Sequence, residues 1–244
     1  MSDSELVALL TVQDLDVSID QHKHRRQTLA ERAELRAVDA EMDAIKAESD
    51  RVAAALAVIS DHESELEAEL AATEHRAAAV SRRLYGGEVS ASRELQAMAA
   101  DVETLKARAS ELEDRGLILL EEREPLDEKV ADLAVRVAAL DIRRGAATAR
   151  LAEAEAVVDA EIDGLTRDRD SSAAGVGAQL LASYERLRAR LGGVGAARLI
   201  GNHCDGCHLT LSSVELDRIR HLGDGEFLTC EQCTRILVPS KPSS

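Results

Sequence analysis

The stretch Leu84-Tyr-Gly-Gly-Glu-Val-Ser-Ala-Ser-Arg-Glu-Leu95 decides the fold, because it separates two long runs of regularly spaced apolar residues. Gly86 and Gly87 form the only glycine pair in the first 180 residues. Paired glycines are a common place for a helix to end and for the chain to reverse its direction. We therefore predict a turn at about residues 85–91 that joins two antiparallel helices.

The segment after the turn has apolar residues at alternating steps of three and four from Leu95 to Leu165. A period of 3.5 residues, kept over roughly ten heptads, is typical of a left-handed coiled coil. We call these positions, and the matching ones before the turn, the seam. Four residues break the apolar rule: Gly116, Arg123, Arg144 and Glu161.

The segment before the turn keeps a similar seam from Leu35 to Leu84, but the stretch from Val12 to Ala33 follows a different phase. The register therefore shifts near residues 29–35, where we expect local unwinding. Many seam residues are alanine, so the helices need a partner helix, either in the same chain or in a second copy. Pro125 lacks a backbone donor, and we expect a kink or break around residues 120–125.

The composition is that of a long helical protein rather than of an ordinary globular domain. Aromatic residues make up 1% of the chain and the formal net charge is −16. Residues 1–174 hold 22 Lys/Arg against 39 Asp/Glu, whereas residues 175–244 hold 8 against 7. Such an acidic body should repel nucleic acid, whose affinity for proteins comes mainly from phosphate neutralisation. No signal peptide and no apolar run of about 18–20 residues is evident, so we expect a cytoplasmic protein that does not insert into a membrane.

All four cysteines lie in two matched pairs, Cys204-Asp-Gly-Cys207 and Cys230-Glu-Gln-Cys233. A gap of two residues lets both sulfurs of a pair reach one metal ion from a single tight turn, which we call a knuckle, and Gly206 is expected to relax the first one. Four thiolates complete the tetrahedral shell of one structural zinc ion. A redox pair of the thioredoxin type would require a preceding βαβ unit, and disulfides would require secretion; neither is indicated.

A four-thiolate zinc site leaves no open coordination position, so we predict that it stabilises a fold and catalyses nothing. His203 and His208 flank the first knuckle and are alternative ligands, although four cysteines already fill the shell. No glycine-rich phosphate loop and no nucleophile constellation is evident. We therefore predict that the protein is not an enzyme and has no catalytic residues.

The predicted fold class is mainly α: a long antiparallel coiled-coil hairpin over residues 1–172, followed by a linking helix and a small zinc ribbon over residues 173–244. A linker at 171–177 precedes a helix at 179–191. Three short strands, at 197–200, 226–229 and 235–238, alternate with the knuckles. The insert 212–222 is expected to form a short helix.

These motifs resemble a family of bacterial coiled-coil proteins with a C-terminal four-cysteine zinc ribbon. The resemblance rests on Gly86-Gly-Glu-Val-Ser, Arg93-Glu-Leu-Gln-Ala-Met, Tyr184-Glu-Arg-Leu-Arg and the two knuckles, and it spans the whole chain. It implies a helical hairpin plus ribbon without enzymatic activity, and some relatives act in flagellar gene expression by contacting an alternative sigma factor or RNA. Thr234 departs from the family, which often has glycine there, so we expect a tighter or strained turn.

Two functional hypotheses follow. The first is an interaction or adaptor protein that presents its hairpin turn and its ribbon to a protein partner, with a role in gene expression. We call residues 82–93 the tip; its candidate partner-binding residues are Tyr85, Arg82, Arg83 and Arg93. The second is nucleic-acid binding through the ribbon and the linking helix, by Arg186, Arg188, Arg190, Arg198, Arg218 and Arg220. Phe227 is the ribbon's only aromatic residue, which leaves little surface for base stacking.

Overall fold

The computed structural model describes residues 3–87, 89–221 and 226–239. Contacts divide the chain into two compact units. The base unit comprises Met1–Ala33 with Thr148–Ser244, and the hairpin unit comprises Glu34–Ala147. Each unit is described by itself. The sequence predicted two domains that are each continuous in sequence, with a boundary between residues 172 and 173, and that boundary stays a prediction.

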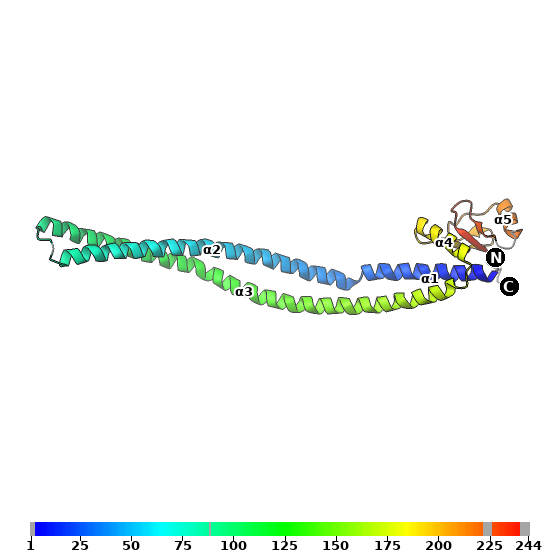
Figure 1. Cartoon of the computed structure of the whole chain (residues 1–244), viewed down its shortest axis with the longest axis horizontal. Helices are drawn as coiled ribbons and strands as arrows, with labels where there is room; N and C mark the ends of the chain where they lie inside the picture. Colours follow the sequence, from blue (N-terminus) through cyan, green and yellow to red (C-terminus); the bar gives the residue numbers. More distant parts are fainter. Residues whose placement is uncertain (1–2, 88, 222–225, 240–244) are drawn as a thin grey trace. The chain divides into compact units, whose positions relative to one another are not determined.

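The hairpin unit is built from parts of two long helices, α2 (Ala30–Tyr85) and α3 (Ser92–Ala173), which the tip connects (Figure 1). The predicted turn is confirmed, because α2 ends at Tyr85 and α3 begins at Ser92. Every buried residue of α2 lies on the predicted seam, at intervals of one heptad: Val38, Ile45, Val52, Ile59, Leu66 and Thr73. In α3, Leu133 and Leu140 pack into the same cluster as Val38, Ile45 and Val52. The heptad pattern therefore places the core between two antiparallel helices.

Ion pairs across the hairpin explain why arginine is tolerated on the seam. Arg123 reaches across to Glu63 with an N–O distance of 2.7 Å, and Arg144 reaches Asp39 at 2.7 Å. Both arginines are accessible to solvent, so each pair adds little to stability. Their main effect is on the register of the two helices. Arg123 pairs with Glu63, whereas Arg144, later in α3, pairs with Asp39, earlier in α2, as antiparallel packing requires.

Helix α3 continues through Pro125, so the helix does not break at residues 120–125. The kink that was predicted as the alternative stays a prediction. Proline removes one backbone hydrogen bond, to the carbonyl of Glu121. Pro125 is exposed and lies off the seam, so water can solvate that carbonyl. Leu119 and Leu126 continue the seam on both sides and keep the helix on its partner.

In the base unit, α1 (Asp3–Gln27) ends just before α2 begins at Ala30. The interruption at residues 28–29 lies at the start of the predicted range 29–35, and residues 30–35 are helical. Helix α1 lies beside the last turns of α3: Arg26 pairs with Asp159 at 2.6 Å and Arg25 with Glu161 at 2.9 Å. Glu161, the third charged residue on the seam, is thereby also paired. Helix α3 includes residues 171–173, so the linker begins at residue 174 rather than at the predicted 171.

The core of the base unit joins α1, the end of α3, the linking helix α4 (Ala178–Arg190) and the ribbon strands. Tyr184 is fully buried at its centre, among residues from all of these elements: Leu9, Val12, Ala173, Val176, Leu180, Ala196 and Ile236. The linking helix α4 therefore packs against α1 and the end of α3. In the described part of the chain, no helix combines the length and the apolar character needed to cross a membrane.

The ribbon is a four-stranded sheet in the order β2-β1-β4-β3, with β1 and β4 parallel and both outer pairs antiparallel. Its strands are β1 (Ala196–Ile200), β2 (His203–Cys204), β3 (Leu228–Thr229) and β4 (Ile236–Pro239). Three were predicted; β2 was missed because its two residues overlap the first knuckle. The predicted insert helix is α5 (Ser213–Arg220), which starts with a capping box between Ser212 and Glu215.

Candidate metal centre

The two knuckles have the same backbone conformation. The amide of His208 donates to the carbonyl of Cys204 at 2.7 Å, and the amide of Thr234 donates to that of Cys230 at 2.8 Å. His208 and Thr234 occupy equivalent places and have φ angles of 60° and 64°. A β-branched residue is strained in this left-handed region, so the strain predicted at Thr234 is confirmed. The bend turns both cysteines of each knuckle toward one point.

The four sulfur atoms form a compact group in which all lie within 4.8 Å of one another. Cys204 Sγ is 3.8 Å from Cys233 Sγ, and Cys207 Sγ is 3.8 Å from Cys230 Sγ. A regular tetrahedron with Zn–S bonds of about 2.3 Å has sulfurs about 3.8 Å apart. The same spacing is nearly twice the length of a disulfide bond, about 2.05 Å. The residues present therefore fit one structural zinc ion.

The electrostatics of the site also favour a cation. Burial raises the pKa of the Cys204 thiol to about 12 and raises that of Cys230. Burial opposes ionisation of Cys233 as well, but hydrogen bonds from the backbone and side chain of Arg235 lower its pKa to about 7. Adjacent buried thiolates are costly unless a metal ion neutralises them, and a coordinating thiol is deprotonated by its metal. Zinc would supply that charge and hold the two knuckles together.

Gly206 is needed for space rather than for the relaxed backbone that the sequence suggested, because its φ is not positive. A Cβ atom there would lie 2.6 Å from Cδ of Arg235 and 2.9 Å from Cβ of Ala197. Arg235 is itself fixed, since its Nε donates to the carbonyl of Val194 at 3.1 Å. The first knuckle thus closes over a side chain of the second and over strand β1.

The metal centre is tied to α1 through Gln13, which sequence reasoning missed. The Gln13 side chain is 4% exposed, and its Oε1 accepts from the amides of Gly195 at 2.7 Å and Ala196 at 3.1 Å. Its Nε2 donates to the carbonyl of Gly193 at 3.1 Å. One amide thereby satisfies three backbone groups at the entry to β1. The sequence did offer one signal: Gln13 lies four residues after Leu9 and therefore on the same face of the helix.

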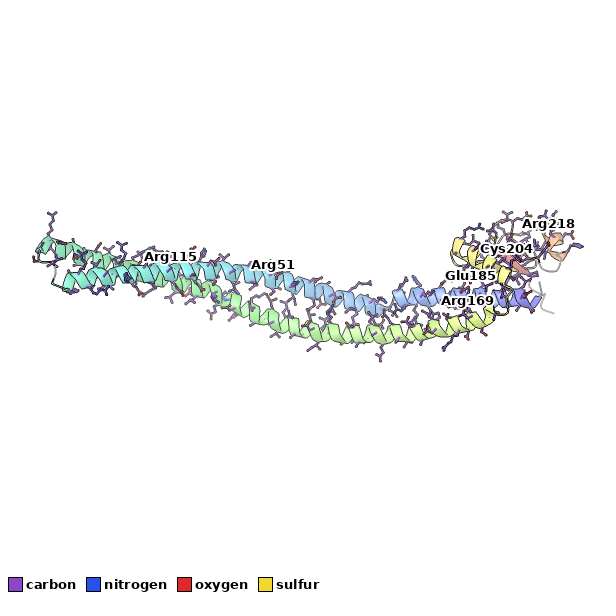
Figure 2. The ribbon with its side chains drawn as sticks, viewed as in Figure 1. Arg51, Arg115, Arg169, Glu185, Cys204 and Arg218 are labelled. Carbon is purple, nitrogen blue, oxygen red and sulfur yellow. The ribbon has the colours of Figure 1, made fainter. Side chains whose placement is uncertain are left out.

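A second buried polar group in the base unit is Asp16, also missed from the sequence. The hydroxyl of Tyr184 donates to Asp16 Oδ2 at 2.6 Å, and Arg169 Nε lies 3.3 Å from Oδ1. Arg169 also pairs with Glu185 of α4; Figure 2 labels both residues. Burial, and then the hydrogen bond to the Asp16 carboxylate, raise the pKa of Tyr184. This network joins α1, α3 and α4 and is structural.

Neither histidine joins the four sulfurs. His203 and His208 are exposed, and Nε2 of His203 lies 3.2 Å from the hydroxyl of Thr210. Within the described ranges, the cluster with metal-binding geometry consists of the four cysteines alone. The cysteine ligands predicted from the spacing are thus brought together, and the alternative histidine ligands are not.

The tip residues lie far from these sulfurs along the sequence and present exposed side chains. Tyr85 is 82% exposed, and Arg82, Arg83 and Arg93 are all exposed. Gly87 has a φ of 77°, and a Cβ on Gly86 would lie 2.7 Å from the carbonyl oxygen of Arg82. Both glycines are therefore required by the turn.

The arginines considered for nucleic-acid binding are largely engaged within the base unit. Arg188 pairs with Asp20 at 2.6 Å, Arg218 with Glu231 at 2.8 Å, and Arg198 with Asp14. Arg190 donates to the hydroxyl of Thr234 at 2.9 Å, and Arg186 to that of Ser183 at 3.1 Å. The side chain of Arg220 lies outside the described residues.

Comparison with known proteins agrees with this geometry. Residues 12–192 match the CT398-like coiled coil hairpin domain, and residues 203–237 match the C4-type zinc ribbon domain. Two uncharacterized proteins of Mycobacterium tuberculosis, MT2288 and Rv2229c, are each 31% identical over 95% of this chain and 94% of their own length. Neither matched family describes a catalytic domain.

Solved structures of similar fold cover nearly the whole chain. A Mycobacterium smegmatis protein has a TM-score of 0.73 at 26% identity, covering 98% of this chain and 99% of its own. CT398 of Chlamydia trachomatis has a TM-score of 0.75 at 17% identity, covering 97% of this chain and 98% of its own. At that identity the second likeness concerns the fold alone.

Proposed function

The chain belongs to the family of CT398-like coiled-coil hairpin proteins, and on this premise we propose that it is a non-catalytic adaptor protein. Its tip docks a protein partner, while the zinc ribbon is a second, rigid contact surface. Control of gene expression, which the resemblance implies for some relatives, is the setting that we propose. A closed four-thiolate shell offers no site for substrate, which supports a role in binding rather than in catalysis.

The exposure of Tyr85 is the observation that carries this proposal. An aromatic side chain that is 82% exposed gains little from its own fold. It is flanked by Arg82, Arg83 and Arg93, and none of these three has an ion-pair partner among the described residues. The sequence places three arginines against Glu88 and Glu94 in this otherwise acidic hairpin. Tyrosine and arginine, together with tryptophan, are enriched among binding hot spots.

The test replaces Tyr85 and Arg93 with alanine and compares affinity purification from native lysate with that of the wild type. Val135→Ala is the matched control, because Val135 is 70% exposed on α3 and outside the tip. We expect the tip variant to lose the protein partner with unchanged melting, and the control to retain it. Lowered melting with intact binding would make Tyr85 a turn-stabilising residue and overturn the proposal.

Nucleic-acid binding through the ribbon is the second candidate. What favours it is the near-neutral charge of residues 175–244, which hold 8 Lys/Arg and 7 Asp/Glu. The internal ion pairs of Arg188, Arg198 and Arg218 weigh against it. Binding that falls steeply with salt supports this alternative, whereas no binding at about 50 mM salt rules it out.

A further inference from the structure

The hairpin unit exposes a run of apolar side chains that the seam does not explain. In the segment Gly116-Leu-Ile-Leu-Leu120, only Gly116 and Leu119 are seam positions. Leu117, Ile118 and Leu120 are 59%, 54% and 56% exposed. The outer positions of a coiled coil are normally polar or charged. Leu117 and Leu120 line the same side of α3, whereas Ile118 lies on another side.

Leu117 and Leu120 form one wall of a groove between α2 and α3. The groove has a volume of about 350 Å³, and its apolar lining is Leu66, Leu70, Leu112, Gly116, Leu117 and Leu120. Gly116 has no side chain, so the groove reaches down to Leu66, whose Cδ2 is 3.5 Å from the position a Cβ would take. An apolar groove between two helices is the shape that accepts a third helix.

The rim of the groove is acidic. Glu63, Glu67 and Glu113 line it, together with the apolar residues and with no lysine or arginine. Glu67 and Glu113 have no ion-pair partner in the described part of the chain. Glu63 binds Arg123 through Oε2 at 2.7 Å, but its Oε1 is buried without a hydrogen-bond donor. Arg123 therefore compensates Glu63, whereas the carboxylates of Glu67 and Glu113 carry uncompensated negative charge at the rim.

The acidity extends along α2 beside the groove. No lysine or arginine occurs between Arg51 and Arg76, whereas this stretch holds six acidic residues. On α3, Arg115 (Figure 2) lines a separate groove with His62 and Ile118 rather than this one. The positive charge that would complement Glu67 and Glu113 therefore comes from whatever binds the groove.

We propose that this groove binds one amphipathic helix of a protein partner, with apolar residues at i, i+3 or i+4 and i+7 against Leu117 and Leu120. Lysine or arginine residues on both sides of that apolar stripe face Glu67 and Glu113. A second copy of this chain fits poorly, because the hairpin unit has 15 Lys/Arg against 26 Asp/Glu and like charges repel. Nucleic acid is disfavoured for the same reason.

This surface is separate from the tip and from the ribbon, and it does not depend on the function proposed for them. Tip variants test that function, and groove variants test this one. If the groove binds its peptide and the tip binds no partner, the present proposal stands and the function proposed for the tip is wrong.

The test titrates the full-length protein with a panel of designed helical peptides that carry four apolar anchors and flanking lysines. Calorimetry at low salt should give saturable one-to-one binding for at least one member of the panel. Leu117→Gln with Leu120→Gln should weaken that binding by about tenfold or more, because two apolar contacts are lost. Val135→Gln with Ile142→Gln is the matched control and should leave it unchanged, since these α3 residues are 70% and 76% exposed outside the groove.

A second arm tests the charge complementarity. Glu67→Gln with Glu113→Gln should weaken binding by roughly fivefold at low salt and by less at high salt. Peptides with glutamate in place of the lysines should not bind. No binding by any lysine-flanked peptide, or binding unchanged by the leucine substitutions, overturns the proposal. Sedimentation showing a dimer that the leucine substitutions dissociate would instead make the occupant a second copy and overturn it as well.

Discussion

Removing the Tyr184 hydroxyl tests whether the base unit is held by the network around Asp16. The Tyr184 side chain is fully buried, and its hydroxyl donates to Asp16 Oδ2 at 2.6 Å. Tyr184→Phe keeps the ring and its packing while leaving that oxygen without its closest donor. The substitution therefore isolates one buried hydrogen bond to a charged group.

The expected loss follows from the contacts that remain. A hydrogen bond to a charged group contributes about 1.5–3 kcal/mol. Asp16 keeps Arg169 Nε at 3.3 Å and Arg188 Nε at 3.5 Å, so its carboxylate stays partly compensated. We expect the lower part of that range, about 1.5–2 kcal/mol. Hydrogen exchange should report this loss for amides of α1 and α4, with little change for amides of the hairpin unit.

The same network predicts a pH dependence. Burial and the Asp16 carboxylate raise the pKa of Tyr184 above its ordinary value of about 10. Because the pKa of Tyr184 is higher in the folded state than in the unfolded state, its contribution to folding stability is complete below a pH of about 10. That contribution is lost as the pH rises from there through the folded-state pKa. In a Tyr85→Phe variant, Tyr184 is the only tyrosine. Phenolate absorbance should then appear only as the base unit unfolds.

Two results would refute this reasoning. One is a Tyr184→Phe protein within about 0.5 kcal/mol of the wild type, the range expected for an exposed substitution. The other is ionisation of Tyr184 near pH of about 10 in the folded protein. Tyr85→Phe is the control, since Tyr85 is 82% exposed and its replacement should leave stability unchanged.

Three further predictions concern the metal and the backbone. Elemental analysis of fresh protein should find one zinc ion per chain, and less than half a zinc ion per chain would count against the site. Removing the zinc with a chelator should unfold the ribbon while most of the helical circular-dichroism signal persists. Gly116→Ala and Gly145→Ala should each raise the unfolding free energy by about 0.5–1 kcal/mol, because alanine favours a helix more than glycine does. There is room for the added Cβ atom, which would lie 3.5 Å from Leu66 at position 116 and would have no neighbour within 4 Å at position 145. A lower unfolding free energy for Gly116→Ala alone would show that the helices cannot accept a methyl group there. Thr234→Gly should stabilise the ribbon by about 1 kcal/mol by relieving a φ of 64°, and a lower melting temperature would mean that the exposed hydrogen bond from Arg190 outweighs that strain.

The heptad pattern and the cysteine spacing were sufficient to predict the hairpin, its turn, the linking helix and the four converging sulfurs. Both signals can be read directly from the sequence. The heptad positions show which face of each helix meets its partner, and the spacing of the cysteines is that of four ligands to one shared zinc ion. Of the kink or break expected at Pro125, the break does not occur, because packing on both sides of the proline holds α3 on its partner. Strand β2 was missed because it consists of two residues that pair only once the first knuckle has folded.

Gln13 and Asp16 could not be assigned from the sequence, because their roles depend on partners more than 150 residues away. Gln13 bonds to Gly193, Gly195 and Ala196, and Asp16 to Tyr184. Polar residues on an apolar helical face indicate a buried partner without identifying it. The exposed apolar residues at Leu117 and Leu120 were likewise hidden within an uninterrupted helical pattern.

The claim that the tip is a docking surface is tested most directly by site-specific photo-crosslinking in cells. A photoreactive residue replaces Tyr85, and the same residue replaces Val135 as the control; both positions are exposed, at 82% and 70%. We predict a discrete protein adduct at position 85 that is absent at position 135 and is lost when Arg93→Ala is added. No adduct at position 85, or the same adducts at both positions, would contradict the account.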